Sequence, residues 1–203
     1  MMKLYYAAPS PYARKVRAMV IETGLQDRVE LCATNPWDSE PALLQGNPLS
    51  KVPTLIADDG AALFDSPLIC EYLDSLHDGE RLIPADGPGR WRALGIQSLA
   101  DGILDAAVAR IVEGRRPAAL RSADWDARQK AAVTRALDRL EQEAKALEVP
   151  VGIAQLAAGC ALGYLDFRFP REPWRDGRPR LAAWYAGFSE RPSMRQTWPE
   201  EIA

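Results

Sequence analysis

The sequence predicts two joined domains of different class, a small α/β domain followed by an all-helical domain. Up to about residue 77, short runs typical of strands alternate with helical stretches, whereas from residue 91 onward every periodic segment has helical spacing. A polar stretch rich in Gly and Pro separates the two parts. We therefore expect domains at 1–79 and 88–203, a division that a chain of 203 residues can accommodate.

The first part has the order β-α-β, then a proline-rich connection, then β-β-α. A helix is expected from Pro11 to Glu22, ended by Gly24, and another from Pro67 to Leu76. Asp59-Gly60, between the last two expected strands, is a strong hairpin signal. The expected strands cover residues 4–6, 29–31, 54–56 and 62–64.

The second part has apolar residues at intervals of three and four. Leu181, Trp184, Tyr185 and Phe188 form an i, i+3, i+4, i+7 face. The stretch 153–167 is apolar on nearly all sides, so we expect it to be the buried central helix of this domain.

The composition limits the chemistry that the side chains can supply. The single histidine, His77, excludes sites that need two, and Cys32, Cys70 and Cys160 have no C-x-x-C spacing. This argues against a metal site, a disulfide framework and dithiol redox chemistry. If the chain is an enzyme, we expect a bound molecule to supply the reactive group.

Charge and hydropathy exclude two further classes of partner. The net charge is −3 and neither part is strongly basic, which argues against a nucleic-acid surface. No apolar run reaches the roughly 20 residues of a membrane helix, and the N-terminus lacks the apolar segment of a signal peptide. We therefore expect a cytoplasmic protein with no membrane partner.

Two Ser-Pro dipeptides, Ser10-Pro11 and Ser66-Pro67, each open an expected helix after an expected strand. Serine at the N-cap followed by proline is a favoured helix start, so both serines can be explained as caps alone. Both helix starts also lie at the carboxyl ends of strands, where free N–H groups and the helix dipole favour anions. A ligand with two separated negative groups could bridge them, and the pattern leaves any small dianion open.

In these features and their order, the sequence resembles the glutathione transferase family. The resemblance spans nearly the whole chain and is densest at residues 10–17 (SPYARKVR), 51–55 (KVPTL) and 64–73 (FDSPLICEYL). It implies a thioredoxin-like N-terminal domain that binds glutathione, a helical domain that binds the second substrate, and a homodimer. Glutathione would be a co-substrate, with no cofactor or metal.

The resemblance also implies which residues hold glutathione. Val52 would pair through its backbone with the cysteinyl part, next to a cis Pro53. Asp65 and Ser66 match the pair that holds the γ-glutamyl end, and Lys51 matches a basic residue near the glycyl carboxylate. The alternative for Lys51 is a solvated loop lysine.

Ser10 matches the catalytic serine of the serine-type classes. A free thiol has a pKa of about 8.5, and a hydrogen bond from the Ser10 hydroxyl together with the helix N-terminus can stabilise the thiolate without a base. Tyr6, at the end of the first strand, is the alternative, because the tyrosine-type classes carry their catalytic hydroxyl there.

Other candidate residues are weaker. Tyr12, Arg110 and Trp174 are candidates for the pocket of the electrophile, with ordinary core or surface roles as the alternative for each. Asp101 could reach across a dimer to the ammonium group of glutathione, or be a solvated helix carboxylate. Ser50 departs from the family, which often has glycine at this loop position.

The expected function is conjugation of the glutathione thiolate to small hydrophobic electrophiles. One alternative is a glutathione-binding protein of the same fold that acts in protein–protein interactions without catalysis. Another is a glutathione-dependent reductase or isomerase, which would use the same site for different chemistry.

Overall fold

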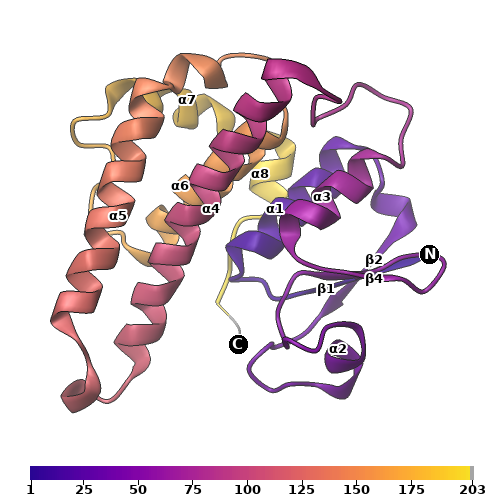
Figure 1. The fold of residues 1–203 in the computed structure, drawn as a ribbon, viewed down its shortest axis with the longest axis horizontal. Coiled ribbons are helices and arrows are strands. Elements are labelled where there is room, and N and C mark those ends of the chain that lie inside the picture. Colours follow the sequence, from indigo (N-terminus) through magenta and orange to yellow (C-terminus); the bar gives the residue numbers. More distant parts are fainter. Residues whose placement is uncertain (202–203) are drawn as a thin grey trace. The chain divides into compact units, whose positions relative to one another are not determined.

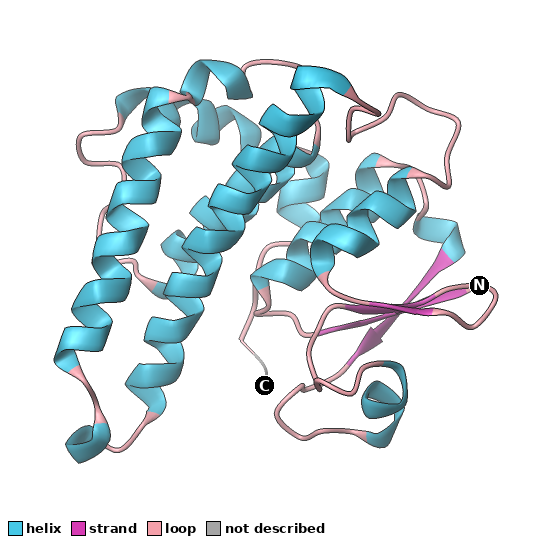
Figure 2. Cartoon of the chain, viewed as in Figure 1, coloured by secondary structure: helices cyan, strands magenta, loops and turns pink. Residues whose placement is uncertain are grey.

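The computed structural model describes residues 1–201, which fall into two compact units (Figure 1). The first comprises Met1–Ala85 together with the described residues from Pro192 onward. The second comprises Asp86–Arg191. The strands belong to the first unit, and within residues 86–191 the described chain consists of helices and loops (Figure 2). A mixed α/β part and a helical part are thus both present, as predicted.

The first unit is built on a four-stranded mixed sheet with strand order β2-β1-β3-β4. β1 is parallel to β2 and antiparallel to β3, and β3 is antiparallel to β4. Figure 1 shows α1 and α3 on one side of the sheet and α2 on the other. This is a thioredoxin-like arrangement. The elements are β1 (Met2–Tyr6), α1 (Pro11–Glu22), the 3-10 turn η1 (Gln26–Arg28), β2 (Val29–Ala33), α2 (Pro41–Gly46), β3 (Thr54–Ile56), β4 (Ala62–Leu63) and α3 (Ser66–Asp74).

Apolar residues at strand and helix periods form the core of this unit. Leu4 of β1 and Leu55 of β3 are register partners and are fully buried. Val16 of α1 and Ile69 of α3 are also fully buried, which fits the packing of these two helices against each other. At about 25 cal/mol per Å² of apolar surface, this burial holds the sheet and both helices together.

The C-terminal segment joins the first unit through α8 (Pro192–Gln196), which packs against α1. The Arg14 guanidinium donates from Nη2 to the carbonyl of Met194 at 3.0 Å, and the Ser193 hydroxyl donates to Glu22 at 2.5 Å. The sequence-based division had placed this segment in the domain 88–203. These contacts are long-range, so local periodicity carries no signal for them.

The second unit is a helical bundle. Its elements are α4 (Gly87–Arg115), η2 (Ala118–Leu120), α5 (Ala123–Gln142), η3 (Ala144–Leu147), α6 (Ile153–Arg168) and α7 (Pro179–Phe188). α4 packs against both α5 and α6. Every residue of α6 from Ile153 to Leu165 is buried, which confirms the predicted central helix.

Two local expectations differ from the structure. The proline-rich connection contains α2, a helix of six residues that is too short to show a hydrophobic period. α3 begins at Ser66 itself, with Asp65 as its N-cap, so Ser66 occupies the first helical position and is not the cap. The Asp65 side chain makes no capping hydrogen bond, which leaves its carboxylate available for other partners.

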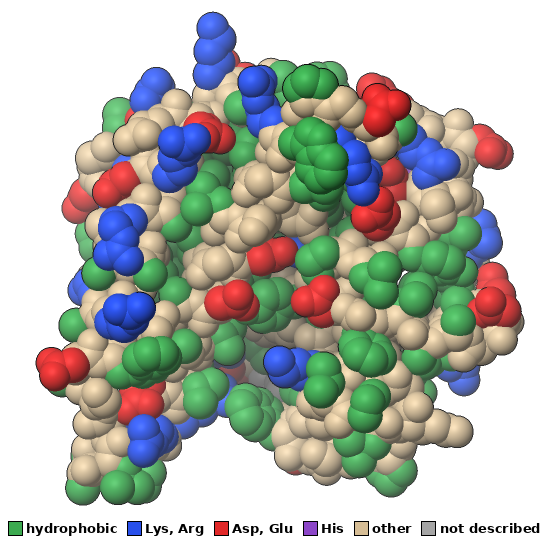
Figure 3. Space-filling view, in the orientation of Figure 1, with side chains coloured by type: hydrophobic (Ala, Val, Ile, Leu, Met, Phe, Trp, Pro, Cys, Tyr) green, Lys and Arg blue, Asp and Glu red, His purple; other side chains and the backbone are tan. Residues whose placement is uncertain are grey.

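The surface has a mixed charge. On the face seen in Figure 3, positive and negative side chains are interspersed. Among the described residues, no helix combines the length and the apolar character needed to cross a membrane.

Candidate functional site

Strand register brings three sequence motifs to one end of the sheet. Tyr5 of β1 is opposite Thr54 of β3, so the residues that follow Tyr5 and those that precede Thr54 are neighbours. Leu55 of β3 is opposite Leu63 of β4, which brings Asp65 to the same end. The motifs that meet there are Ser10-Pro11, Val52-Pro53 and Asp65-Ser66.

Ser10 is the N-cap of α1, as predicted. Its backbone is extended, its Oγ accepts the N–H of Ala13 at 3.2 Å, and Pro11 follows at the first helical position. The bond to Ala13 uses an acceptor lone pair, so the hydroxyl proton remains for donation to a ligand. The first turn of α1 carries no acidic side chain, and the helix N-terminus therefore favours an anion beside Ser10.

The Val52–Pro53 peptide bond is cis. The loop before it is fastened by Asn47, which is 1% exposed. The Asn47 amide donates to the carbonyl of Lys51 at 3.1 Å and to the Thr54 hydroxyl at 3.0 Å, and its oxygen accepts from the N–H of Leu49 at 3.0 Å. Thr54 in turn donates to the Lys51 carbonyl at 2.8 Å. These bonds fix the backbone on both sides of Val52, while the Lys51 side chain stays exposed.

Ser50, in the same loop, has a positive φ of 51°. This left-handed conformation favours glycine, which gives a physical reason why glycine suits the position. The Ser50 hydroxyl donates to the Pro36 carbonyl at 3.0 Å, and this bond helps to hold the serine there.

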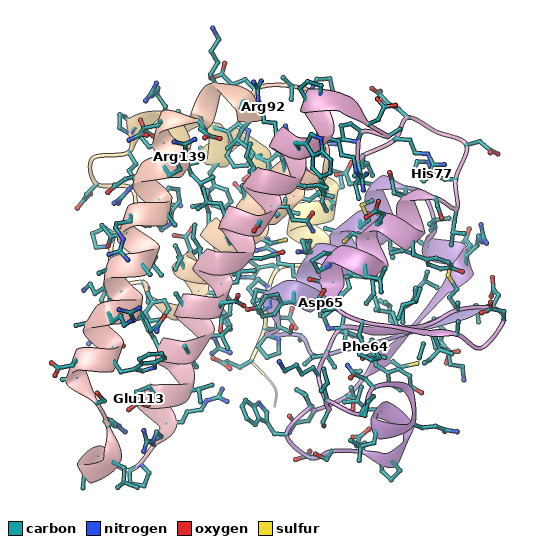
Figure 4. The ribbon with its side chains drawn as sticks, in the orientation of Figure 1. Phe64, Asp65, His77, Arg92, Glu113 and Arg139 are labelled. Atoms are coloured by element: carbon teal, nitrogen blue, oxygen red, sulfur yellow. The ribbon has the colours of Figure 1, made fainter. Side chains whose placement is uncertain are left out.

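Asp65 and Ser66 lie where the chain passes from β4 into α3 (Figure 4). The Phe64–Asp65 peptide bond is cis. Asp65 is exposed, whereas Ser66 is only 1% exposed. The N-terminus of α3 is thus a second helix start that favours an anion. The Asp65 carboxylate beside it can accept hydrogen bonds from an ammonium group.

Tyr6 and Tyr12 are both half-buried, in β1 and in the first turn of α1. The Arg17 guanidinium lies over the Tyr6 ring at 4.7 Å. Tyr6 is thus at the same end of the sheet as Ser10, and both hydroxyl candidates stay open.

Arg110, in the second unit, has structural partners. Its guanidinium is buried and donates to Asp126 at 2.9 Å and to both carboxylate oxygens of Glu172 at 2.8 and 3.1 Å. It also lies over the ring of Phe169 at 4.3 Å. These contacts tie α4 to α5 and to the segment after α6, a role that accounts for Arg110 without a substrate.

Trp174 also has structural partners. It is 5% exposed, its indole N–H donates to Asp166 at 2.8 Å, and its ring meets Tyr185 edge-on at 5.8 Å. The indole is therefore accounted for by packing in the helical unit. Asp101, on α4, is half-buried.

The second unit also has a cavity of about 930 Å³ between α4, α5 and η3. Its lining includes the apolar Ile96, Leu99 and Val149 and the charged Arg92 and Arg139, which are labelled in Figure 4. Within residues 1–201, no cluster of three or more His, Cys, Asp or Glu side chains is placed to hold a metal ion.

A thioredoxin-like sheet with a cis-proline beside two anion-favouring helix starts, in one chain with a helical domain, has the architecture of the glutathione transferase class. Family models agree with this class. The glutathione S-transferase N-terminal domain matches residues 9–76, and the glutathione S-transferase C-terminal domain matches residues 103–187. The chain belongs to the glutathione S-transferase family.

Three relatives illustrate the similarity. The chain is 35% identical over 201 residues to the uncharacterized GST-like protein YibF of Escherichia coli K12, covering 98% of both chains. A glutathione transferase family member from Pseudomonas fluorescens Pf-5, solved with bound glutathione, has 44% identity and a TM-score of 0.96 over 99% of this chain and 100% of that one. A second structure from that strain, with bound S-(propanoic acid)-glutathione, has 41% identity and a TM-score of 0.90 over the whole of both chains.

Sequence reasoning missed two groups near this end of the sheet. Asn47 stands before a proline, and Asn-Pro is a turn signal that could have marked it as the residue that fastens the loop. Arg14 and Arg17 follow Ser10 by four and seven residues, a spacing that places all three on one helix face.

Proposed function

We propose that the protein conjugates the thiolate of glutathione to small electrophiles, with Ser10 stabilising the thiolate. The observation that carries the proposal is the Ser10 hydroxyl, which caps α1 through a lone pair and keeps its proton at the end of the sheet where Pro53 is cis. Support also comes from the Pseudomonas relatives solved with glutathione and with a glutathione conjugate.

Glutathione is held, in this proposal, by the three motifs that meet at the end of the sheet. The backbone of Val52 pairs with the cysteinyl part, and the exposed Lys51 lies near the glycyl carboxylate. The γ-glutamyl end has a carboxylate and an ammonium group, which suit the helix start at Ser66 and the Asp65 carboxylate. Opposite charges are thus matched at each end of the tripeptide.

The energetics of the serine are sufficient for thiolate formation. Lowering the thiol pKa from about 8.5 by two units takes roughly 2.7 kcal/mol. A hydrogen bond from Ser10 to the anion supplies about 1.5–3 kcal/mol, and the N-terminus of α1 adds about 0.3–1 kcal/mol. The thiol proton leaves to water, and no protein base is needed. The thiolate then forms a C–S bond with the electrophile as the leaving group departs.

The test compares wild type with Ser10→Ala and Tyr6→Phe, using glutathione and 1-chloro-2,4-dinitrobenzene. We expect Ser10→Ala to keep its affinity for glutathione and to lose most of its turnover, and Tyr6→Phe to keep both. Turnover that survives Ser10→Ala but not Tyr6→Phe would assign the hydroxyl to Tyr6. Glutathione binding with no turnover for any electrophile would favour a binding protein, and turnover without consumption of glutathione would favour an isomerase.

We also propose that the protein is a homodimer in which Asp101 approaches the glutathione ammonium group of the partner subunit. Light scattering should then give twice the chain mass of 22.4 kDa. Asp101→Asn should raise KM for glutathione without changing that mass. A monomer, or an unchanged KM in the variant, would remove this role from Asp101. Among the candidates for the electrophile pocket, Tyr12 is the one that we retain.

A further inference from the structure

Two arginines follow Ser10 along one face of α1. Arg14 stands four residues after Ser10, and Arg17 stands three after Arg14, so each is a neighbour of the one before it on the same helix face. Tyr6, whose ring lies 4.7 Å from the Arg17 guanidinium, joins this face to the end of the sheet where the three motifs meet. The arginine pair therefore lies on the face of α1 that begins at Ser10, the proposed site of the thiolate.

Arg14 has more hydrogen-bond donors than acceptors around it. Its side chain is among the largest that are fully buried, at 1% exposure, and Nη2 donates to the Met194 carbonyl at 3.0 Å. Nε and Nη1 are buried and have no hydrogen-bond partner among the described residues. A guanidinium offers five N–H groups, so a single carbonyl leaves most of them unused. The Trp198 ring, half exposed, lies 5.0 Å from the guanidinium.

Arg17 also has more hydrogen-bond donors than acceptors around it, and it is more exposed than Arg14. It is half-buried, its Nη2 donates to the Gln196 carbonyl at 3.5 Å, and its Nε is buried without a partner among residues 1–201. Burial lowers the pKa of Arg17, and the nearby Arg14 lowers it further, while Tyr6 and Glu200 raise it. Even so, an arginine remains charged at neutral pH.

The partners of this arginine pair are a poor match for two positive charges. Within residues 1–201, the groups that accept its hydrogen bonds are the backbone carbonyls of Met194 and Gln196 in α8, which carry only partial negative charge. Glu200, the carboxylate that acts on Arg17, is exposed. A small carboxylate would supply further acceptors and a full negative charge, because its two oxygens match the planar fork of a guanidinium.

We infer that Arg14 and Arg17 form the subsite for an anionic second substrate, a small electrophile that carries a carboxylate. The inference rests on the proposed function, since it places the carboxylate on the same face of α1 as Ser10, where the thiolate is proposed to form. Arg17, which is half-buried, is the accessible contact, and the fully buried Arg14 acts on the subsite through its charge. An α,β-unsaturated carboxylate is the simplest electrophile of this class.

In the reaction of such a substrate, the arginines stabilise the negative charge that develops on its carboxylate. The sulfur forms a bond to the β-carbon, and the C=C electron pair moves onto the α-carbon and the carboxylate. Water then gives a proton to the α-carbon, which balances the proton that the thiol lost. The carboxylate holds additional negative charge in the transition state, and donors aimed at developing charge lower the barrier most.

The kinetic test uses acrylate and acrylamide, which have nearly the same shape and differ in charge. Each rate is divided by the uncatalysed rate with glutathione, so that intrinsic reactivity cancels. Wild type should accelerate the acrylate reaction more than the acrylamide reaction. In Arg17→Gln the acrylate kcat/KM should fall about tenfold or more, as the loss of a charge-assisted hydrogen bond implies, with the acrylamide value nearly unchanged.

Two further variants separate the subsite from a general effect of charge. Arg17→Lys keeps the charge but not the fork, and should recover part of the acrylate rate. Lys3→Gln removes one positive charge from an exposed position at the opposite end of β1, and should leave the acrylate-to-acrylamide ratio unchanged. Equal acceleration of both substrates by wild type, or an equal loss of both in Arg17→Gln, would overturn the inference.

A binding measurement gives a readout that is independent of turnover. Calorimetry compares S-(2-carboxyethyl)glutathione with S-propylglutathione, and wild type should bind the carboxylated conjugate more tightly, a preference that Arg17→Gln should lose. If wild type binds both conjugates equally and turns over 1-chloro-2,4-dinitrobenzene normally, the anion subsite is rejected and the proposed function stands. If neither conjugate binds and no electrophile is turned over, the proposed function itself fails.

Discussion

Arg14 donates to the carbonyl of Met194 at 3.0 Å, across 180 residues of sequence. Met194 itself is fully buried, so the short helix α8 is fastened to α1 by both a polar and an apolar contact. This segment therefore contributes to the stability of the first unit, although it is the last helix of the chain that the structure describes.

Met194→Ala should destabilise the protein. Truncating a fully buried methionine removes apolar contacts and leaves a cavity, at a cost of about 2–5 kcal/mol. For a chain of this size, each kcal/mol lowers Tm by roughly 2–4 °C. Calorimetry on Met194→Ala and on Arg195→Ala checks this, because Arg195 is exposed on the same helix and its loss should be small. Equal losses in the two variants would contradict a core role for Met194.

Asn47→Ala should weaken both the fold and glutathione binding. The variant loses three hydrogen bonds of a buried side chain, each worth about 0.5–1.5 kcal/mol, and frees the backbone before the cis-proline. We expect a lower Tm and a KM for glutathione raised severalfold. Asn47→Asp keeps the acceptor for Leu49 but lacks the donors to Lys51 and Thr54, so it should resemble the alanine variant. An unchanged KM in both variants would show that the loop does not position glutathione.

Local signals predicted the parts of this protein that depend on neighbouring residues. Ser10 and Pro11 specify a helix start by themselves, and the apolar stretch of α6 specifies a buried helix. The sequence could not indicate that Arg110 faces Glu172, because that ion pair spans 62 residues and depends on how three segments pack. Asp65 has the extended backbone of an N-cap and Ser66 is already helical, and the Ser-Pro dipeptide alone does not distinguish these two positions.

Ser50 provides a test of backbone strain against hydrogen bonding. Glycine at this position relieves the left-handed conformation, worth about 1–2 kcal/mol, but loses the bond to Pro36 and adds chain entropy. Ser50→Gly should therefore lie within about 1 kcal/mol of wild type. Ser50→Ala loses the bond and keeps the strain, so it should be the less stable variant in urea unfolding. The reverse order would contradict the assigned conformation.

We expect the protein to lose stability in acid as the Glu172 carboxylate, which is paired with Arg110, becomes protonated. The hydrogen bonds from Arg110 hold the pKa of Glu172 below its ordinary value of 4.5, with partial opposition from burial. Because the pKa of Glu172 is lower in the folded state, its ionised carboxylate stabilises the fold at pH values above the ordinary pKa. This stability is lost as the pH falls through the lowered pKa. The contribution is about 1 kcal/mol or less, because the side chain is partly exposed and screened.

Thermal unfolding between pH 3 and pH 7 measures this effect. Wild type should lose more Tm toward pH 3 than Glu172→Gln, which has no carboxylate to protonate at that position. Glu148→Gln, at an exposed position, is the matched control and should follow wild type. Parallel curves for wild type and Glu172→Gln would mean that the ion pair with Arg110 adds nothing to acid stability.

Ser10 combines a structural and a proposed chemical role, and three substitutions separate them. Ser10→Ala removes both the cap and the hydroxyl, at a stability cost of about 1 kcal/mol, whereas glycine is a fair N-cap and costs only a few tenths. Ser10→Gly should thus keep nearly the wild-type Tm and lose turnover as severely as alanine. Ser10→Thr keeps a hydroxyl and should retain part of the activity. The pKa of bound glutathione, followed by thiolate absorbance near 240 nm, should rise toward about 8.5 in the alanine and glycine variants. Turnover that tracked Tm instead of the hydroxyl would leave Ser10 as a cap alone.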